Sequence, residues 1–126
     1  MRNFLKSILL IAFIFFGLFV LPTGTKTIAE ESTTITQVKA SHILVETEEE
    51  ADSLKTRIDN GENFGLLAKK YSKCPSGENG GDLGYFKRGQ MVKEFEIAAF
   101  NLPTNKVSEP VKTDFGWHLI KVYDKI

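Results

Sequence analysis

Several residue types are scarce in this chain of 126 residues, which contains one cysteine, one tryptophan and two histidines. Because Cys74 is the only cysteine, no internal disulfide can form, and stability has to come from a hydrophobic core. No cysteine closely follows the N-terminal apolar run either, so a lipid-modified N-terminal cysteine is not indicated. A chain of this length has room for one domain with one small core.

An excess of positive charge is also missing. From Glu30 onward, thirteen Lys and Arg residues face sixteen Asp and Glu residues, which gives a net charge of −3. A nucleic-acid-binding protein normally carries a basic surface, so the sequence excludes that class.

The N-terminus carries the pattern of a secretory leader. Arg2 and Lys6 precede fourteen uncharged, mostly apolar residues from Ile8 to Leu21. As a helix this run would span about 21 Å, short of a bilayer core of about 30 Å. We therefore predict a signal peptide over residues 1–29, cleaved after Ala29, with an N-terminal membrane anchor formed by residues 4–21 as the alternative.

The rest of the chain alternates strand and helix patterns. Residues 30–36 are polar and predict a tether, and residues 37–126 predict the folded domain. The pattern indicates strands at 38–45, 107–113 and 117–123, and helices at about 48–59, 63–72 and 92–100. Thr47 and Glu50 form a capping box at the first helix, and Asn60-Gly61 ends it. These elements predict an α+β fold with a small, mainly antiparallel sheet.

The stretch from Cys74 to Phe95 is unusual for a loop. It holds five of the ten glycines within thirteen residues, together with placed apolar side chains such as Leu83 and Met91. Met91 and Phe95 are spaced as neighbours on one helical face. The glycines indicate positive φ angles or close backbone approaches, so the stretch is a shaped structure and not a flexible linker.

Three motifs in this chain together resemble the parvulin family of peptidyl-prolyl cis/trans isomerases. They are SHILV at 41–45, CPSGENGGDLGYFKRGQMVKEF starting at Cys74, and TDFGWHLIKV starting at Thr113. The resemblance covers residues 37–126. It implies a parvulin/FKBP-like fold of four strands and about four helices, with the first and last strands side by side in the centre.

The resemblance also implies a set of functional residues. The polar, catalytic set is His42, Cys74, Thr113 and His118, and the substrate-binding set is Leu83, Met91, Val92, Phe95 and Phe115. In the family the two histidines hydrogen-bond with each other and with the threonine. Phe115 and Val92 stand where some members have a small hydroxyl residue and a glutamine, which makes this pocket more apolar.

The implied reaction is rotation about an X-Pro peptide bond, whose barrier of about 18 to 20 kcal/mol comes from amide resonance. An apolar cup that holds the proline and polar groups that steady the twisted amide suffice, without nucleophile, cofactor or metal. The expected partners are unfolded or loop segments of exported proteins, and the protein is expected to act as a monomer in a periplasmic or extracellular location.

Other readings of the same residues stay open. Cys74 with one histidine could form a cysteine hydrolase, and Cys74 with both histidines could bind zinc. Met91 and Phe95 could belong to the core, and Cys74 could be a small buried apolar residue. A further alternative is a chaperone-like module that binds proline-containing segments with little turnover.

The sequence also predicts that phosphorylated residues before proline are not preferred. Relatives with that preference carry an inserted basic loop between the first strand and the first helix. Here the equivalent segment, 46–50, reads ETEEE, and no Lys or Arg occurs between Lys39 and Lys55.

Overall fold

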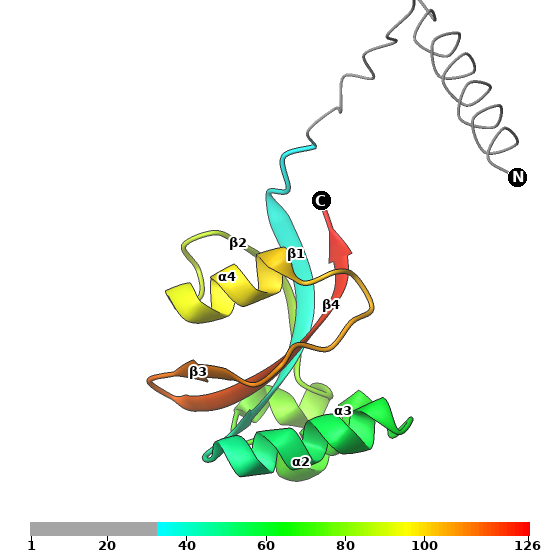
Figure 1. Ribbon diagram of the computed structural model, residues 1–126. Helices are drawn as coiled ribbons and strands as arrows, with labels where there is room; N and C mark the ends of the chain where they lie inside the picture. The colour runs from blue at the N-terminus through cyan, green and yellow to red at the C-terminus, as the bar shows by residue number, and fades with distance from the viewer. Residues whose placement is uncertain (1–32) are drawn as a thin grey trace, which may run out of the picture. The chain divides into compact units, whose positions relative to one another are not determined.

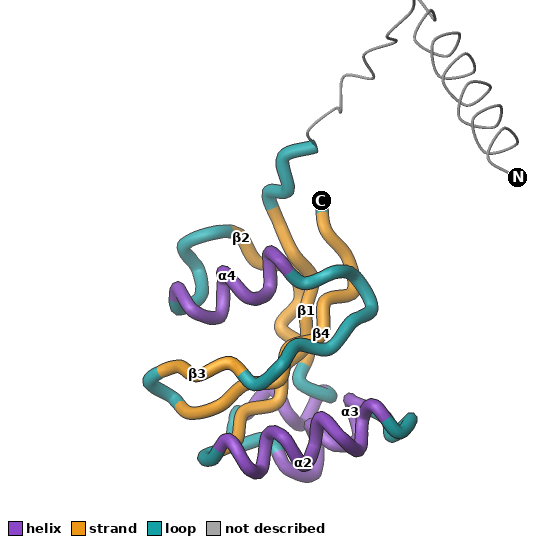
Figure 2. The backbone as a smooth tube through the Cα atoms, in the orientation of Figure 1, coloured by secondary structure: helices purple, strands orange, loops and turns teal. Residues whose placement is uncertain are grey.

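The computed structural model describes residues 33–126 (Figures 1 and 2). The predicted leader and the first residues of the predicted tether lie outside this range. The elements in chain order are β1 (Gln37–Val45), α2 (Glu48–Asp59), α3 (Phe64–Tyr71), the 3-10 helix η1 (Pro75–Asn79), β2 (Asp82–Lys87), α4 (Lys93–Asn101), β3 (Val111–Thr113) and β4 (Gly116–Lys125). None of the helices within residues 33–126 is long and apolar enough to cross a membrane.

The four strands form one antiparallel sheet in the order β2-β1-β4-β3. The two long strands, β1 and β4, therefore lie side by side in the centre, although they are at opposite ends of the domain's sequence (Figure 1). Their register places Leu44 opposite His118 and His42 opposite Ile120. The predicted α+β class and the central position of the first and last strands are confirmed.

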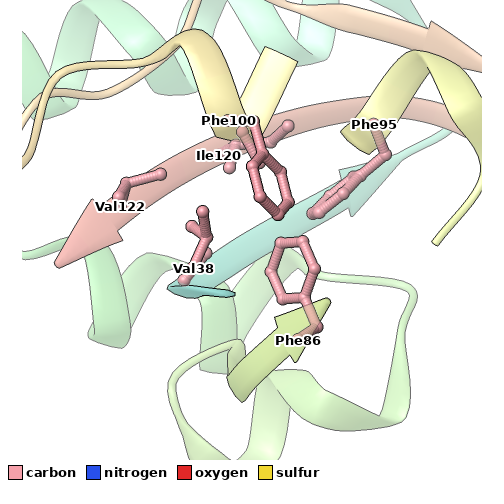
Figure 3. Close-up of a cluster of buried hydrophobic side chains, with 8 residues drawn as sticks. Val38, Phe86, Phe95, Phe100, Ile120 and Val122 are labelled. Atoms are coloured by element: carbon pink, nitrogen blue, oxygen red, sulfur yellow. The ribbon is translucent and has the colours of Figure 1, made fainter. Parts of the chain in front are cut away.

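One core cluster lies between α4 and the sheet. Its buried members come from β1, β2, α4 and β4, and three phenylalanine rings meet in its middle (Figure 3). The cluster consists of Val38, Ala40, Phe86, Phe95, Ala99, Phe100, Ile120 and Val122. Because side chains alternate along a strand, these residues lie on one face of β1 and β4.

A second core cluster lies on the opposite face, under α2 and α3. It consists of Ile43, Val45, Ala51, Leu54, Phe64, Leu67, Ala68 and Leu119. The two clusters use different halves of β1, since Val38 and Ala40 belong to the first and Ile43 and Val45 to the second. His42 and His118 share the face of the first cluster, next to Phe95 of α4, with ring centroids 5.5 and 5.4 Å from the Phe95 ring.

Side chains cap the first two helices, and at the first helix they do so as the sequence predicts. Thr47 accepts a hydrogen bond from the Glu50 N–H (3.2 Å), and the Glu50 carboxylate reaches back to the N–H of Glu46. Asn63 accepts from the Leu66 N–H at 3.0 Å and starts α3 in the same way. Gly61 follows α2 with φ +101°, the conformation expected of a residue after a helix end.

Two segments differ from the predicted pattern. The strand predicted over 107–113 is reduced to β3, because Pro110 has no N–H to donate; before it, only Val107 bridges to Lys121. Strand β2 was not predicted, because Gly84, with φ +64°, interrupts its alternating pattern.

Smaller points concern the helix count, the position of Met91 and the end of the tether. The described residues contain three α-helices and one 3-10 helix, where about four helices were expected. Met91 precedes α4, so it does not share a helical face with Phe95, although both line the same cavity. Ile35 packs against the first core cluster and Thr36 donates to the carbonyl of Ile126, so the end of the predicted tether contacts the domain.

Candidate active site

The two histidines are joined directly at the centre of the sheet. His42 Nδ1 and His118 Nδ1 are 3.1 Å apart, and the rings stack with an interplanar angle of 16°. On the far side, His118 Nε2 is 2.7 Å from Thr113 Oγ1, which also accepts a hydrogen bond from the N–H of Phe115. The pairing of Leu44 with His118 brings the two rings together, since it sets the strand register of this face.

The network continues to a residue that sequence reasoning missed. Ser76 Oγ lies 3.1 Å from His42 Nε2 and donates to the sulfur of Cys74 at 3.3 Å. Ser76 lies in η1, two residues after Cys74. Ser76 belongs to the second parvulin-like motif, but no spacing rule indicates that its side chain reaches a histidine on β1.

One arrangement of protons satisfies every contact in this chain of groups. Because Ser76 donates to Cys74, its oxygen accepts from the N–H at His42 Nε2. His42 Nδ1 then accepts from His118 Nδ1–H, and His118 Nε2 accepts from the Thr113 hydroxyl. Both rings are neutral in this arrangement, and the Cys74 S–H remains available to the cavity.

Burial keeps both histidines neutral near pH 7. The pKa of His42 is lowered from 6.5 to about 4, mainly by burial and further by the neighbouring His118. Burial also lowers the pKa of His118. The exposed fractions of the two residues, 6% and 4%, agree with this cause. The site therefore presents dipoles, and not positive charges, to whatever enters it.

An apolar cavity of about 410 Å³ opens above this network. Its lining residues are His42, Leu44, Cys74, Leu83, Gln90, Met91, Val92, Phe95, Phe115 and His118. All five predicted substrate-binding residues are among them, as are three of the four predicted catalytic residues; Thr113 lies behind His118. Leu44 and Gln90 were not predicted as site residues.

The depth of the lining residues separates a floor from a rim. Phe95 is 3% exposed and belongs to the first core cluster, so it also supports the fold. Phe115 is 70% exposed and Val92 is 38% exposed, so both lie at the mouth. The cavity is therefore built into the core at its base and offers apolar surface at its edge.

Charged side chains are absent from the lining of this cavity. Arg88, two residues before Gln90 of the lining, lies with its guanidinium carbon 4.2 Å from the centre of the Phe100 ring and pairs with Glu96 at 3.8 Å. A larger hollow of about 490 Å³ between α2 and α3 has several charged walls, including Glu49, Arg57 and Lys73, and neither histidine. It has none of the chemistry of the first cavity.

The backbone next to the site is packed without room for a side chain. Gly81 accepts a hydrogen bond from the N–H of His42 at 2.9 Å and donates to the carbonyl of Ser76 at 2.8 Å. A Cβ atom added to Gly81 would lie 2.1 Å from the His42 carbonyl oxygen, and its φ is +82°. Gly81 thus holds the segment that carries Ser76 against β1.

The geometry tests the two alternatives for Cys74, a cysteine hydrolase and a zinc site. Its sulfur contacts Ser76 and reaches His42 through that hydroxyl, so no histidine is in direct contact to act as a base. Within residues 33–126, no group of three or more His, Cys, Asp or Glu side chains is placed to hold a metal ion. The zinc alternative therefore has no ligand set in the described part of the chain.

Comparisons with known proteins agree with this geometry. Residues 25–126 match the family model described as PPIC-type PPIase domain. The foldase protein PrsA of Geobacillus sp. (strain WCH70) is 58% identical over 90 residues, which cover 71% of this chain and 33% of the relative. This chain thus spans about a third of the length of that curated relative.

Two solved structures share the fold. The crystal structure of the peptidylprolyl isomerase PrsA from Bacillus anthracis has a TM-score of 0.72 and 46% identity, covering 73% of this chain and 43% of that one. The solution structure of NmPin, the parvulin of Nitrosopumilus maritimus, has a TM-score of 0.66 and 47% identity. It covers 71% of this chain and 97% of that chain.

Proposed function

Since this chain belongs to the PPIC-type peptidyl-prolyl isomerase family, the parvulins, we propose that it catalyses cis/trans isomerisation of X-Pro bonds in exported polypeptides. The observation that carries the proposal is the uncharged cavity, which ends on a buried network of neutral polar groups. Its clients are unfolded or loop segments, which expose X-Pro bonds to a cavity of this kind.

The apolar lining favours the transition state of the reaction. Twisting the peptide bond removes amide resonance, so the twisted form is less polar than the planar one. A cavity without charged lining residues therefore favours the twisted form over the ground state. Leu83, Met91 and Phe95 hold the proline ring, and Val92 and Phe115 contact the neighbouring residues of the polypeptide.

The polar groups act by orientation. Thr113 and the two histidines hold Ser76, and Ser76 holds the sulfur of Cys74 at the wall of the cavity. In this role Cys74 is a polar contact for the carbonyl before proline. No bond is made or broken to it, so the reaction requires no cofactor, metal or acyl intermediate.

A protease-coupled assay on short X-Pro peptides tests the proposal. Wild-type protein should accelerate isomerisation, and Met91→Ala should reduce kcat/KM by about tenfold, because half-buried Met91 forms cavity wall. Circular dichroism should stay native for this variant. Phe95→Ala is a poorer test, since Phe95 belongs to the core and its loss should cost about 3 to 5 kcal/mol of stability.

Wild-type turnover no faster than the uncatalysed rate would instead support the chaperone-like binding module. The exposed apolar rim at Phe115 and Val92 favours that second candidate. Peptide binding without turnover would identify it.

A further inference from the structure

The loop between β2 and α4 forms one wall of the cavity. Residues 88–92 contain no helix or strand, yet Gln90, Met91 and Val92 all line the cavity. Gly89 has φ +84°, with open space around the position where a Cβ would lie. A glycine-containing loop of this kind needs a specific attachment if it is to keep a fixed wall.

A carboxylate on α4 supplies this attachment. Glu96 accepts a hydrogen bond from the backbone N–H of Gly89, and its carboxylate is 3.8 Å from the guanidinium of Arg88. The Glu96 side chain is 16% exposed, well below the 61% of Arg88. Arg88 is itself held over the ring of Phe100, so the contact joins the loop to a residue of the first core cluster.

The helix offers no other side chain in this role. Val92, at the N-cap of α4, makes no side-chain capping hydrogen bond. Within the loop, Gln90 Oε1 accepts from the N–H of Lys87 at 2.7 Å, which fixes the start of the loop to β2. The middle of the loop is held to α4 through Glu96.

We propose that Glu96 is a positioning residue for the cavity: it holds Gly89 and thereby sets the wall made by Gln90 and Met91. This inference rests on the proposed function, because it assumes that the cavity receives a proline-containing segment. A wall held in place before binding loses less conformational freedom when the ligand enters. Loss of the contact should therefore weaken binding and leave the twisting step nearly unchanged.

Three variants of the full chain separate this role from general damage. Glu96→Ala removes both contacts, and Glu96→Gln keeps an oxygen that can accept from Gly89. Glu94→Ala is the matched control, because Glu94 lies in the same first turn and is exposed. Binding is measured as the Kd of an Ala-Ala-Pro-Phe peptide by NMR titration, and kcat and KM by the coupled assay on the same peptide.

We expect Glu96→Ala to raise both Kd and KM by about tenfold, with kcat within about twofold of wild type. Glu96→Gln should restore most of the affinity, and Glu94→Ala should bind as wild type does. An unchanged Kd for Glu96→Ala, an equal loss in Glu94→Ala, or a Gln variant as weak as the Ala variant would overturn the proposal.

Hydrogen exchange on the wild-type protein gives a test that needs no variant. The Gly89 amide should be protected before peptide is added, and rapid exchange there in the free protein would contradict the proposal. The outcomes also separate from those for the proposed function. If wild type binds the peptide without turning it over, the isomerase assignment fails while the Kd comparison still tests Glu96.

Discussion

At the residue scale, Cys74 is the group whose chemistry the network constrains most. Its sulfur accepts from Ser76, and no histidine contacts it. Isomerisation breaks no σ bond, so a polar atom at this position is sufficient and a nucleophile is not required. An aspartate at this position keeps the contact with Ser76, because a carboxylate oxygen also accepts from the Ser76 hydroxyl.

We therefore expect Cys74→Asp to keep kcat/KM within about tenfold of wild type in the coupled assay. Cys74→Ala should lose more, about ten- to a hundredfold, since a polar contact worth about 1 to 3 kcal/mol disappears. Mass spectrometry of the protein incubated with substrate provides the control. A covalent substrate adduct on Cys74, or an Asp variant weaker than the Ala variant, would argue for a nucleophilic role.

The buried histidine pair should make stability depend on pH. The pKa of His42 is lowered from 6.5 to about 4, mainly by burial and further by His118, and burial also lowers that of His118. The unfolded chain thus binds more protons than the folded one at mildly acidic pH. The stabilisation is fully present above pH 6.5 and is lost as the pH falls towards 4.

Urea unfolding between pH 7.5 and 5 should show much of this loss, because few carboxylates titrate in that range. For His42, the difference between the ordinary pKa of 6.5 and the pKa of about 4 in the folded state corresponds to about 3 kcal/mol in the free energy of unfolding. His42→Asn should start less stable and show a shallower dependence. A wild-type profile that stays flat from pH 7 to 5 would mean that the rings are not held neutral by burial.

At the element scale, the sequence carried local signals better than pairings. Thr47 and Gly61 marked the ends of α2 because capping chemistry is local. Strand β2 carried no such signal, since Gly84 with a positive φ breaks its alternation.

The candidate site shows the same limit. Alternation placed His42 on an apolar face, but the 3.1 Å contact with His118 depends on the register of β1 and β4 across 76 residues of sequence. Ser76 was missed because its contact with His42 spans 34 residues of sequence and depends on where η1 packs against α3. Family resemblance supplied the residue set that local patterns could not.

The backbone link from η1 to β1 runs through Gly81, which accepts from the N–H of His42 and donates to the carbonyl of Ser76. A Cβ atom there would lie 2.1 Å from the His42 carbonyl oxygen, and φ is +82°. Gly81→Ala should therefore cost about 3 kcal/mol or more in the free energy of unfolding. Gly84→Ala is the matched control, with φ +64° and open space, and should cost about 1 to 2 kcal/mol.

Thermal unfolding of both variants measures the difference. The Gly81 variant should also lose isomerase activity at temperatures where it is still folded, because displacement of η1 moves Ser76 and Cys74. Equal melting temperatures for the two variants would show that the close approach at Gly81 relaxes without cost.

At the scale of the whole molecule, the two core clusters lie on opposite faces of the sheet. The site lies on the face of the first cluster, at the point along β1 where the first cluster ends and the second begins. Ala40 belongs to the first cluster and Ile43 to the second, with His42 between them on β1. His42 and His118 are buried on the face that packs against α4, and both still border the cavity. The charge around this opening determines which polypeptides can enter it.

The final prediction is that phosphoserine before proline is not preferred. The cavity has no charged lining residue, and its histidines are neutral near pH 7 because their pKa values are lowered. Arg88 is held by Glu96 and Phe100.

The segment after β1, where relatives with the preference carry basic residues, is instead exposed and acidic at Glu46 to Glu50. A phosphate group of nearly two negative charges therefore meets no cation among the lining residues of the cavity with which it could pair. Rates on matched Ser-Pro and phosphoserine-Pro peptides measure the effect, and the unmodified peptide should be turned over at least as fast. A phosphopeptide about ten times faster would require a cation that reaches the cavity, and Arg88→Ala would then show whether Arg88 had left Glu96 to provide it.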